Sequence, residues 1–262
     1  MRDERVKCPV HRGGDRNCAI WRDERGRVHA KCWSRGCPEQ EILAALGDFR
    51  RSVVPWSASR QAGDDAKRAE LARRIWNASR AAARTPGETY LRSRGITIEV
   101  PPTIRFHPAL RHPSGAYAPA MVAAVEHVRT GTIVVAIHRT WLTADGSDKA
   151  NLKPQKAALS PIAGGAVRLA PASEILALAE GIETALSFQQ ATRIASWATL
   201  GSSNLTCVEL PECVREIMIA ADADLTGENA AQAAAQRFTR EGRKVRIARP
   251  EPGQDFNEYL RA

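Results

Sequence analysis

The chain has 262 residues, of which 44% are hydrophobic and 26% are charged. This is the composition of a folded globular protein, and the length allows one substantial core together with a small additional module. No window holds the ~18 uncharged apolar residues that a membrane span needs, and the charged start MRDERVKCPV lacks the apolar stretch of a signal peptide. We therefore expect a cytoplasmic protein without a membrane partner.

The formal net charge of +9 and the isoelectric point near 9.6 favour a polyanionic partner. Cationic side chains release counterions from nucleic-acid phosphates, which makes such binding favourable. Four of the six cysteines lie within the first 37 residues. In a reducing compartment, cysteines are more often metal ligands or buried thiols than disulfides.

The first module, residues 1–49, combines clustered Cys and His with a short amphipathic helix in PEQEILAALGDF. Its first motif is a C-x2-H pair, and a second close pair follows a ribbon with strand-like alternation. Two such pairs separated by a hairpin supply the four ligands of a tetrahedral zinc site. The sequence therefore predicts one structural Zn²⁺ bound by Cys8, His11, Cys32 and Cys37.

Two nearby residues leave this ligand set open, because either Cys18 or His29 can replace one of the four. The C-x4-C spacing between Cys32 and Cys37 is also wider than is usual for a zinc knuckle. Gly36 favours Cys37 as the ligand, since a glycine there lets the chain turn back to the metal.

The strings CPVH and CWSRGC, the latter followed by EILAAL, resemble the Cys-His-Cys-Cys zinc ribbon of bacterial and phage primases. The longer second knuckle departs from that family. In the family the ribbon contacts template DNA, so the resemblance implies phosphate contacts from cations and base stacking on indoles. The candidates are Arg12, Arg16, Trp21, Arg22, Lys31, Trp33 and Arg35.

The middle of the chain predicts a linker followed by a small mixed α+β subdomain. Residues 50–67 mix Pro, Ser, Gly and charge without a period, which is typical of a linker. Residues 69–84 carry apolar positions at helical spacing, and Pro86 with Gly87 is expected to end that helix. Two later apolar runs around a short turn predict a β-hairpin within the subdomain, residues 68–170.

Residues 171–262 alternate strand-like and helical segments, which predicts an α/β domain with a mainly parallel, Rossmann-like sheet. Functional groups of such sheets lie at the carboxyl ends of the strands. Glu180 follows the first of these strands, Asp222 and Asp224 follow a later one, and Asp255 follows the last.

Carboxylates spaced D-x-D on extended backbone point to one side, so Asp222 and Asp224 can share a hard cation, with Glu180 joining from a neighbouring strand. A D-x-D alone is more often a helix cap or a solvated turn. Mg²⁺ suits the combined set, because it takes oxygen ligands and neutralises a transferring phosphoryl group. We expect one to three Mg²⁺ or Mn²⁺ ions.

The order Glu-Gly, Asp-x-Asp-x-x-Gly and a third acidic site resembles the Toprim domain of primases, topoisomerases and related nucleases. The resemblance implies that Glu180, Asp222 and Asp224 are catalytic residues that bind the metal. Asp255 corresponds less securely to the last acidic metal site of the family.

Two further features of this domain have more than one interpretation. Glu183 is either a neighbour of the metal ligands or an ordinary first-turn helix residue. The string TLGSSN, residues 199–204, resembles a small-residue loop of primase Toprim domains. Gly201 and Ser202 there either let a phosphate approach or form a plain turn.

Upstream, YLRSRGI, IRFHP and HRTWLTADGSDKA resemble the part that precedes Toprim in proteins of phages, plasmids and integrated elements. His138 beside Arg139 is the histidine most worth testing. The resemblance and the positions make four cations candidates for binding nucleoside triphosphates or the primer strand, the alternative being solubilising loop charges. They are Arg139, Lys149, Lys153 and Lys156.

Together these resemblances imply a DNA primase-like nucleotidyltransferase that makes short RNA primers on single-stranded DNA by Mg-dependent phosphoryl transfer. The expected partners are the DNA template, nucleoside triphosphates and a separately encoded helicase or polymerase, because the sequence has no phosphate-binding loop of a fused ATPase. One alternative is a Toprim nuclease that cleaves DNA or RNA. A second is a non-catalytic, zinc-containing DNA-binding module.

Overall fold

The computed structural model describes residues 4–11, 18–22, 28–33, 35–46, 58–131, 134–250 and 256–257. The chain divides into two compact units, residues 1–61 and residues 62–262. Within the described segments, no helix has both the length and the apolar character needed to cross a membrane.

The first unit contains a three-stranded antiparallel sheet and one helix. The strands are β1 (Glu4–Val6), β2 (Cys18–Arg22) and β3 (Val28–Cys32), in that order, and the helix is α1 (Glu39–Leu46). Ile42 of α1 is fully buried against Cys8, Cys18 and Cys32. The apolar core of this unit is therefore small and is built around cysteines, which makes a metal the natural source of further stability.

The second unit begins with a helix where the sequence predicted a linker. Helix α2 (Ala58–Ala78) starts inside residues 50–67, so the linker prediction was wrong from residue 58 onward. The polar residues taken as linker signals are good helix formers or tolerated on an exposed face. Near its end α2 packs Ala72, Ile75 and Trp76 against the antiparallel sheet.

Pro86 starts a helix rather than ending the preceding one. Helix α2 stops at Ala78, and α3 (Pro86–Ser93) follows after the short strand β4 (Arg80–Ala81). Thr85 caps α3, since its hydroxyl oxygen accepts a hydrogen bond of 3.1 Å from the Gly87 N–H. Proline fits the first helical position because its missing N–H has no intrahelical partner there.

A five-stranded antiparallel sheet forms the first half of this unit, in the order β4-β5-β6-β7-β8. Its longer strands are β5 (Ile104–Arg111), β6 (Tyr117–Glu126), β7 (Val134–Trp141) and β8 (Lys156–Leu159), with a short 3-10 turn, η2 (Val128–Thr130), after β6. The pairing of β6 with β7 confirms the predicted hairpin.

A second five-stranded sheet has the order β13-β12-β10-β11-β9 and is parallel except for the edge strand β9. This confirms the predicted mainly parallel sheet. The strands are β9 (Val167–Arg168), β10 (Ile175–Ala179), β11 (Ser196–Ala198), β12 (Glu216–Ala220) and β13 (Lys244–Ala248); the helices are α4 (Ile182–Thr192), α5 (Ser202–Leu205) and α6 (Leu225–Arg240).

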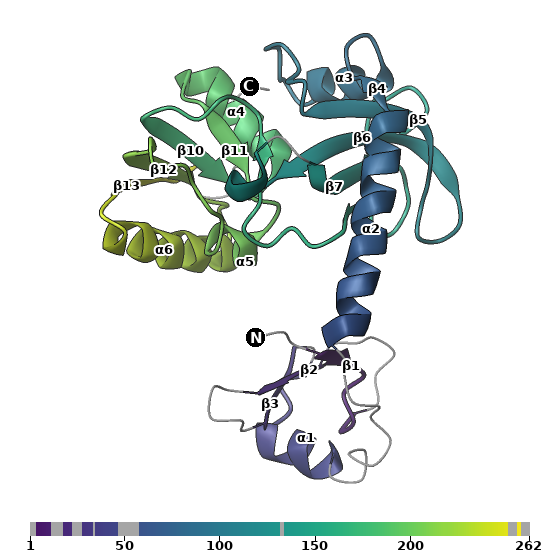
Figure 1. The fold of residues 1–262 in the computed structure, drawn as a ribbon, viewed down its shortest axis with the longest axis vertical. Coiled ribbons are helices and arrows are strands. Elements are labelled where there is room, and N and C mark those ends of the chain that lie inside the picture. The colour runs from purple at the N-terminus through teal and green to yellow at the C-terminus, as the bar shows by residue number, and fades with distance from the viewer. Residues whose placement is uncertain are drawn as a thin grey trace. The chain divides into compact units, whose positions relative to one another are not determined.

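Helices cover both faces of the parallel sheet, as Figure 1 shows. Along β10, Ala177 and Ala179 pack into one core with α4, whereas Leu176 and Leu178 pack into another core with α6. The alternation follows from the two-residue period of a strand. The core under α4 also contains Phe106 and other side chains of the antiparallel sheet, so the two sheets share one apolar interior.

Candidate metal centres

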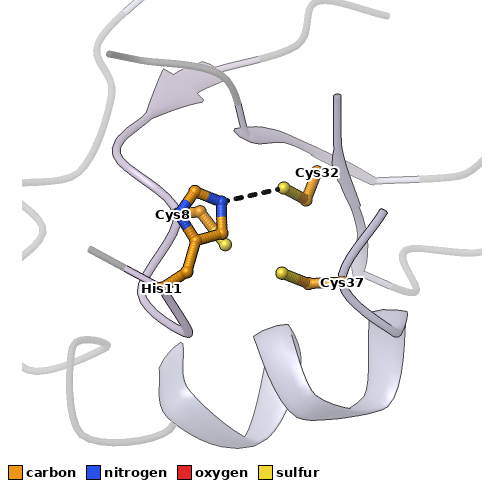
Figure 2. A group of neighbouring side chains, drawn as sticks. All are labelled: Cys8, His11, Cys32 and Cys37. Atoms are coloured by element: carbon orange, nitrogen blue, oxygen red, sulfur yellow. Dashed lines mark hydrogen bonds between the residues drawn. The ribbon is translucent and has the colours of Figure 1, made fainter. Parts of the chain in front are cut away.

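Four side chains of the first unit point toward a common centre (Figure 2). Cys8 and His11 lie in the turn after β1, Cys32 ends β3, and Cys37 precedes α1. Their ligand atoms all lie within 4.8 Å of one another, and Nε2 of His11 is 3.2 Å from Sγ of Cys32. Tetrahedral zinc with bonds of about 2.3 Å to sulfur separates its sulfurs by roughly 3.8 Å, so the four residues fit one zinc ion.

The turn between the last two ligands depends on Gly36. This glycine has a φ of 59°, a left-handed conformation that costs glycine little, and nothing crowds its α-carbon. The chain thereby reverses within the wide C-x4-C knuckle and returns Cys37 to the centre. Burial and the neighbouring sulfurs of Cys32 and Cys8 raise the pKa of the Cys37 thiol to about 11. Crowded thiols of this kind lose their protons when a metal binds.

Neither alternative ligand belongs to this group of four, although Cys18 lies beside Cys8 and Cys32. His29 lies 3.0 Å from Oε1 of Glu39 through Nδ1 and stacks on Trp21, with ring centres 5.5 Å apart. Cys18 is buried in the core beside Cys32, its partner in the β2–β3 register. Among the described residues, the four converging ligand atoms come from Cys8, His11, Cys32 and Cys37 alone.

The other two cysteines correct an expectation from the sequence. Cys207 and Cys213 are exposed free thiols, neither metal ligands of this cluster nor buried. They lie in the second unit, in a stretch without a close Cys/His pair.

The acidic residues follow two neighbouring parallel strands. Glu180 comes directly after β10, and Asp222 and Asp224 follow β12, whose last residue Ala220 pairs with Ala179. The negative charges of both aspartates raise the pKa of Glu180. The predicted acidic edge of the sheet is therefore present. Asp255, the fourth predicted ligand, lies outside the described residues.

Glu180 has one oxygen held and one without a protein partner. The Ser202 hydroxyl donates a hydrogen bond of 2.8 Å to Oε2, whereas Oε1 is buried with no hydrogen-bond partner among the described residues. Burial raises the pKa of Glu180, the Ser202 hydrogen bond opposes this, and Asp222 and Asp224 raise it further. A divalent cation would satisfy the orphaned oxygen and relieve the repulsion, so the donor set fits Mg²⁺ or Mn²⁺.

Asp224 has a structural role as well. It is the N-cap of α6, and its Oδ1 accepts a hydrogen bond of 2.7 Å from the Gly227 N–H. A β-carbon on Gly227 would lie 2.8 Å from both Cβ and the carbonyl oxygen of Asp222. The glycine of Asp-x-Asp-x-x-Gly is therefore required for the close approach of α6 to Asp222. Within the described chain, the acids do not converge as tightly as the zinc ligands do.

The loop 199–204 is held by side-chain and backbone hydrogen bonds and is not a plain turn. Leu200 has a φ of 68°, which is uncommon for a residue with a β-carbon, and its N–H donates to the Glu180 carbonyl oxygen. The amide of buried Asn204 donates to the carbonyl oxygens of Gly165 and Thr199. These bonds place Ser202 beside Glu180. The sequence singled out Ser202 for phosphate binding and missed this contact.

One predicted nucleotide contact has a different role. Arg139 is buried; its guanidinium donates to the carbonyl oxygens of Ala157 and Ala158 and lies over the Trp141 ring. Arg139 lies on β7 and its guanidinium bonds to β8, so it connects two strands and its donors are not free to bind a phosphate. Its neighbour His138 has a buried Nδ1 without a hydrogen-bond partner in the described chain, and burial lowers the pKa of its ring to about 4.

The three lysines differ in their surroundings. Lys149 forms an ion pair of 3.6 Å with Glu183, and Lys156 is exposed and acts electrostatically on Glu180 and Glu183. Lys153 is exposed as well. Two of the three predicted cations therefore lie beside the acidic edge.

On the zinc ribbon, two of the predicted DNA contacts present exposed groups. Trp33 is 56% exposed, with the ammonium of Lys31 at 4.0 Å from its ring centre, and Arg35 is exposed. Arg12 and Arg16 lie outside the described residues, as does the side chain of Arg22.

Comparison with known families identifies the class of the second half of the chain. Residues 175–262 match the model of the Toprim domain, and residues 66–169 match a domain of unknown function, DUF7146. The chain thus contains a Toprim domain whose acidic edge is formed by Glu180, Asp222 and Asp224. No curated protein matches the chain.

Solved structures share the fold at low sequence identity. A DNA primase domain from Pseudomonas aeruginosa matches with a TM-score of 0.50 and 16% identity, covering 74% of each chain. The DnaG primase catalytic domain bound to single-stranded DNA matches with a TM-score of 0.51 and 15% identity, covering 78% of each chain. These matches confirm the resemblance to primases for the fold, and the Cys-His-Cys-Cys group of the first unit fits a zinc ribbon.

Proposed function

We propose that this protein is a DNA primase that joins ribonucleotides into short RNA primers on a single-stranded DNA template. The observation that carries the proposal is Glu180, whose buried Oε1 lacks a hydrogen-bond partner among the described residues while two aspartates lie close enough to raise its pKa. Such a site is electrostatically incomplete without a divalent cation. The shared primase fold supports the same reading.

Glu180, Asp222 and Asp224 would hold Mg²⁺ or Mn²⁺, in a number from one to three. The metal would supply charge neutralisation for the phosphoryl group and lower the pKa of the attacking hydroxyl. The chain's own residues act by position. Ser202 orients Glu180, Gly227 lets α6 approach Asp222, and the Asp224 cap fixes the start of α6.

Lys149, Lys153 and Lys156 would bind the phosphates of the nucleoside triphosphate or the primer, as point charges near the acidic edge. The zinc ribbon would bind the template through Trp33, Arg35 and Arg12, with stacking on the exposed indole and phosphate contacts from the arginines. The protein partner would be a separately encoded helicase or polymerase.

Synthesis of labelled RNA from ribonucleotides on single-stranded DNA tests the proposal, with Asp222→Ala as the inactive control. RNA that lengthens with time supports a primase. Shortening of the DNA template supports the nuclease alternative, and retention of DNA binding without either reaction supports a non-catalytic module.

A further inference from the structure

Tyr90, Lys149 and Glu183 form a mostly buried cluster close to the acidic edge. The Tyr90 hydroxyl donates a hydrogen bond of 2.6 Å to Oε1 of Glu183, and the Lys149 ammonium lies 3.6 Å from the same oxygen. That ammonium is also 6.0 Å from the centre of the Tyr90 ring. The cluster joins α3 and the loop after β7 to the first turn of α4, and so joins the DUF7146 region to the Toprim domain.

Glu183 is ionised in this setting. Its side chain is only 13% exposed, and burial alone would raise the pKa of its carboxyl. The charge of Lys149 and the hydrogen bond from Tyr90 outweigh burial and lower the pKa to about 2. Breaking a buried ion pair leaves an uncompensated charge and destabilises the folded protein. Glu183 and its two partners therefore hold one another in place.

Glu183 is not placed as a metal ligand, although it follows Glu180 by less than one helical turn. Its Oε1 is engaged by Tyr90 and Lys149 on the side of the antiparallel sheet. Its charge acts instead on cations. Lys156, at the start of β8, interacts electrostatically with Glu183 and also with Glu180. Glu183 therefore binds Lys149 directly and acts on Lys156 only through its charge.

Lys149 keeps the capacity to bind a second anion. An ammonium has three donors, and the Lys149 side chain is 20% exposed, so Glu183 and the Tyr90 ring do not enclose it. Holding a flexible lysine in one orientation reduces the entropy lost when a ligand binds. A phosphate at this point would bind the Lys149 ammonium.

We infer that Glu183 is a positioning residue, which holds Lys149 for the triphosphate of the incoming nucleotide, and that Tyr90 fixes Glu183. The identity of this ligand rests on the proposed function. The role is distinct from catalysis, because Glu183 acts through Lys149, which it binds through Oε1.

The test is equilibrium binding of a fluorescent ATP analogue to the full chain in Ca²⁺, followed by anisotropy, with thermal unfolding of every variant. Glu183→Gln is expected to raise the Kd about tenfold and Tyr90→Phe about threefold, whereas Glu183→Asp restores most of the affinity. The matched control is Glu216→Gln. Glu216 pairs with Lys244 and Arg246 at 3.0 Å each, at the opposite end of the same sheet, and its loss is expected to leave the Kd unchanged.

Unchanged binding by folded Glu183→Gln overturns the inference, because a carboxylate that only connects α3 and α4 gives that result. Tighter binding also overturns it, because a carboxylate that only repels phosphate gives that result. If Glu183→Gln does not fold, Tyr90→Phe decides, because it keeps the ring and removes only the hydroxyl. Wild-type protein that does not bind the analogue also overturns the inference. Binding with the expected pattern but without RNA synthesis contradicts the proposed function and leaves the positioning role intact.

Discussion

The hydroxyl of Ser202 donates a hydrogen bond of 2.8 Å to Oε2 of Glu180, which fixes the carboxylate at the acidic edge of the Toprim domain. The other oxygen, Oε1, is buried with no hydrogen-bond partner in the described part of the chain. One oxygen is thus anchored by protein and the other is left for a cation. The serine reaches this position because Leu200 and Gly201 both adopt positive φ angles in the loop before α5.

Replacing Ser202 with alanine should weaken the response to metal. Without the hydroxyl, Glu180 can rotate, and we expect the half-saturating Mg²⁺ concentration to rise about threefold to tenfold, or about 0.6–1.4 kcal/mol, the range of one typical hydrogen bond. Ser203→Ala is the matched control, because Ser203 is exposed and adjacent. A metal titration of activity checks this, and equal Mg²⁺ dependence of the two variants would show that Ser202 does not orient Glu180.

Replacing Gly227 with alanine should destabilise the acidic edge. The new β-carbon would lie 2.8 Å from Cβ and the carbonyl oxygen of Asp222, so the start of α6 must move. Overpacking of this kind costs about 1–3 kcal/mol. Urea unfolding measures the loss. Gly63→Ala in α2 is the control, since its β-carbon meets nothing within 4 Å, and it should stabilise the protein by roughly 0.4–1 kcal/mol.

The sequence predicted the parts of the molecule that depend on spacing and order. The convergence of the two Cys/His pairs, the β6–β7 hairpin and the parallel sheet follow from motif spacing and apolar periodicity. The prediction that Pro86 ends a helix was wrong, because Pro86 begins α3. A proline can end one helix or begin another, depending on the residue before it. Thr85 supplied the cap that decides between them.

Contacts between distant segments were beyond sequence reasoning. Tyr90 and Glu183 are far apart in the sequence, and no local pattern marks a tyrosine that bonds a buried carboxylate. The same is true of Arg139, whose charge predicted a phosphate contact although tertiary packing placed its guanidinium on strand carbonyls. The charge of an arginine alone does not show whether its side chain is buried against backbone carbonyls or is free to bind a phosphate.

Glu180→Gln should stabilise the protein in the absence of divalent metal. A carboxyl whose folded pKa is raised contributes stability below its unfolded pKa, and that contribution is lost as the pH rises through the folded pKa. At pH 7 the ionised Glu180 therefore opposes folding, and the neutral amide removes this cost. A rise in Tm of about 2–4 °C corresponds to 1 kcal/mol for a domain of this size.

The difference between wild type and Glu180→Gln should shrink as the pH falls toward 4, where Glu180 is protonated. Mg²⁺ should raise the Tm of the wild type and have little effect on the variant. Thermal unfolding at pH 4 and pH 7 with and without Mg²⁺ measures both effects. A variant that is less stable than wild type at pH 7 without metal would contradict this account of the acidic edge.

Zinc content should separate the ligands from their neighbours. The purified chain is expected to hold about one zinc ion, because four ligand atoms converge, and Cys37→Ser should lose most of it. Cys213→Ser and His29→Ala should retain it, since Cys213 is exposed and His29 is engaged with Glu39. Elemental analysis of the four proteins decides the matter, and zinc loss in His29→Ala would restore His29 as a ligand.

The most direct test of the central claim follows two labels in one reaction, on the ribonucleotides and on the 5′ end of a single-stranded DNA template, with Mg²⁺ present. Asp222→Ala serves as the inactive variant and Glu212→Ala, an exposed acid away from the acidic edge, as its control. We predict labelled RNA that grows to several nucleotides in wild type and Glu212→Ala and is absent in Asp222→Ala, with the DNA intact. Shortened DNA that depends on Asp222, without RNA product, would contradict the account.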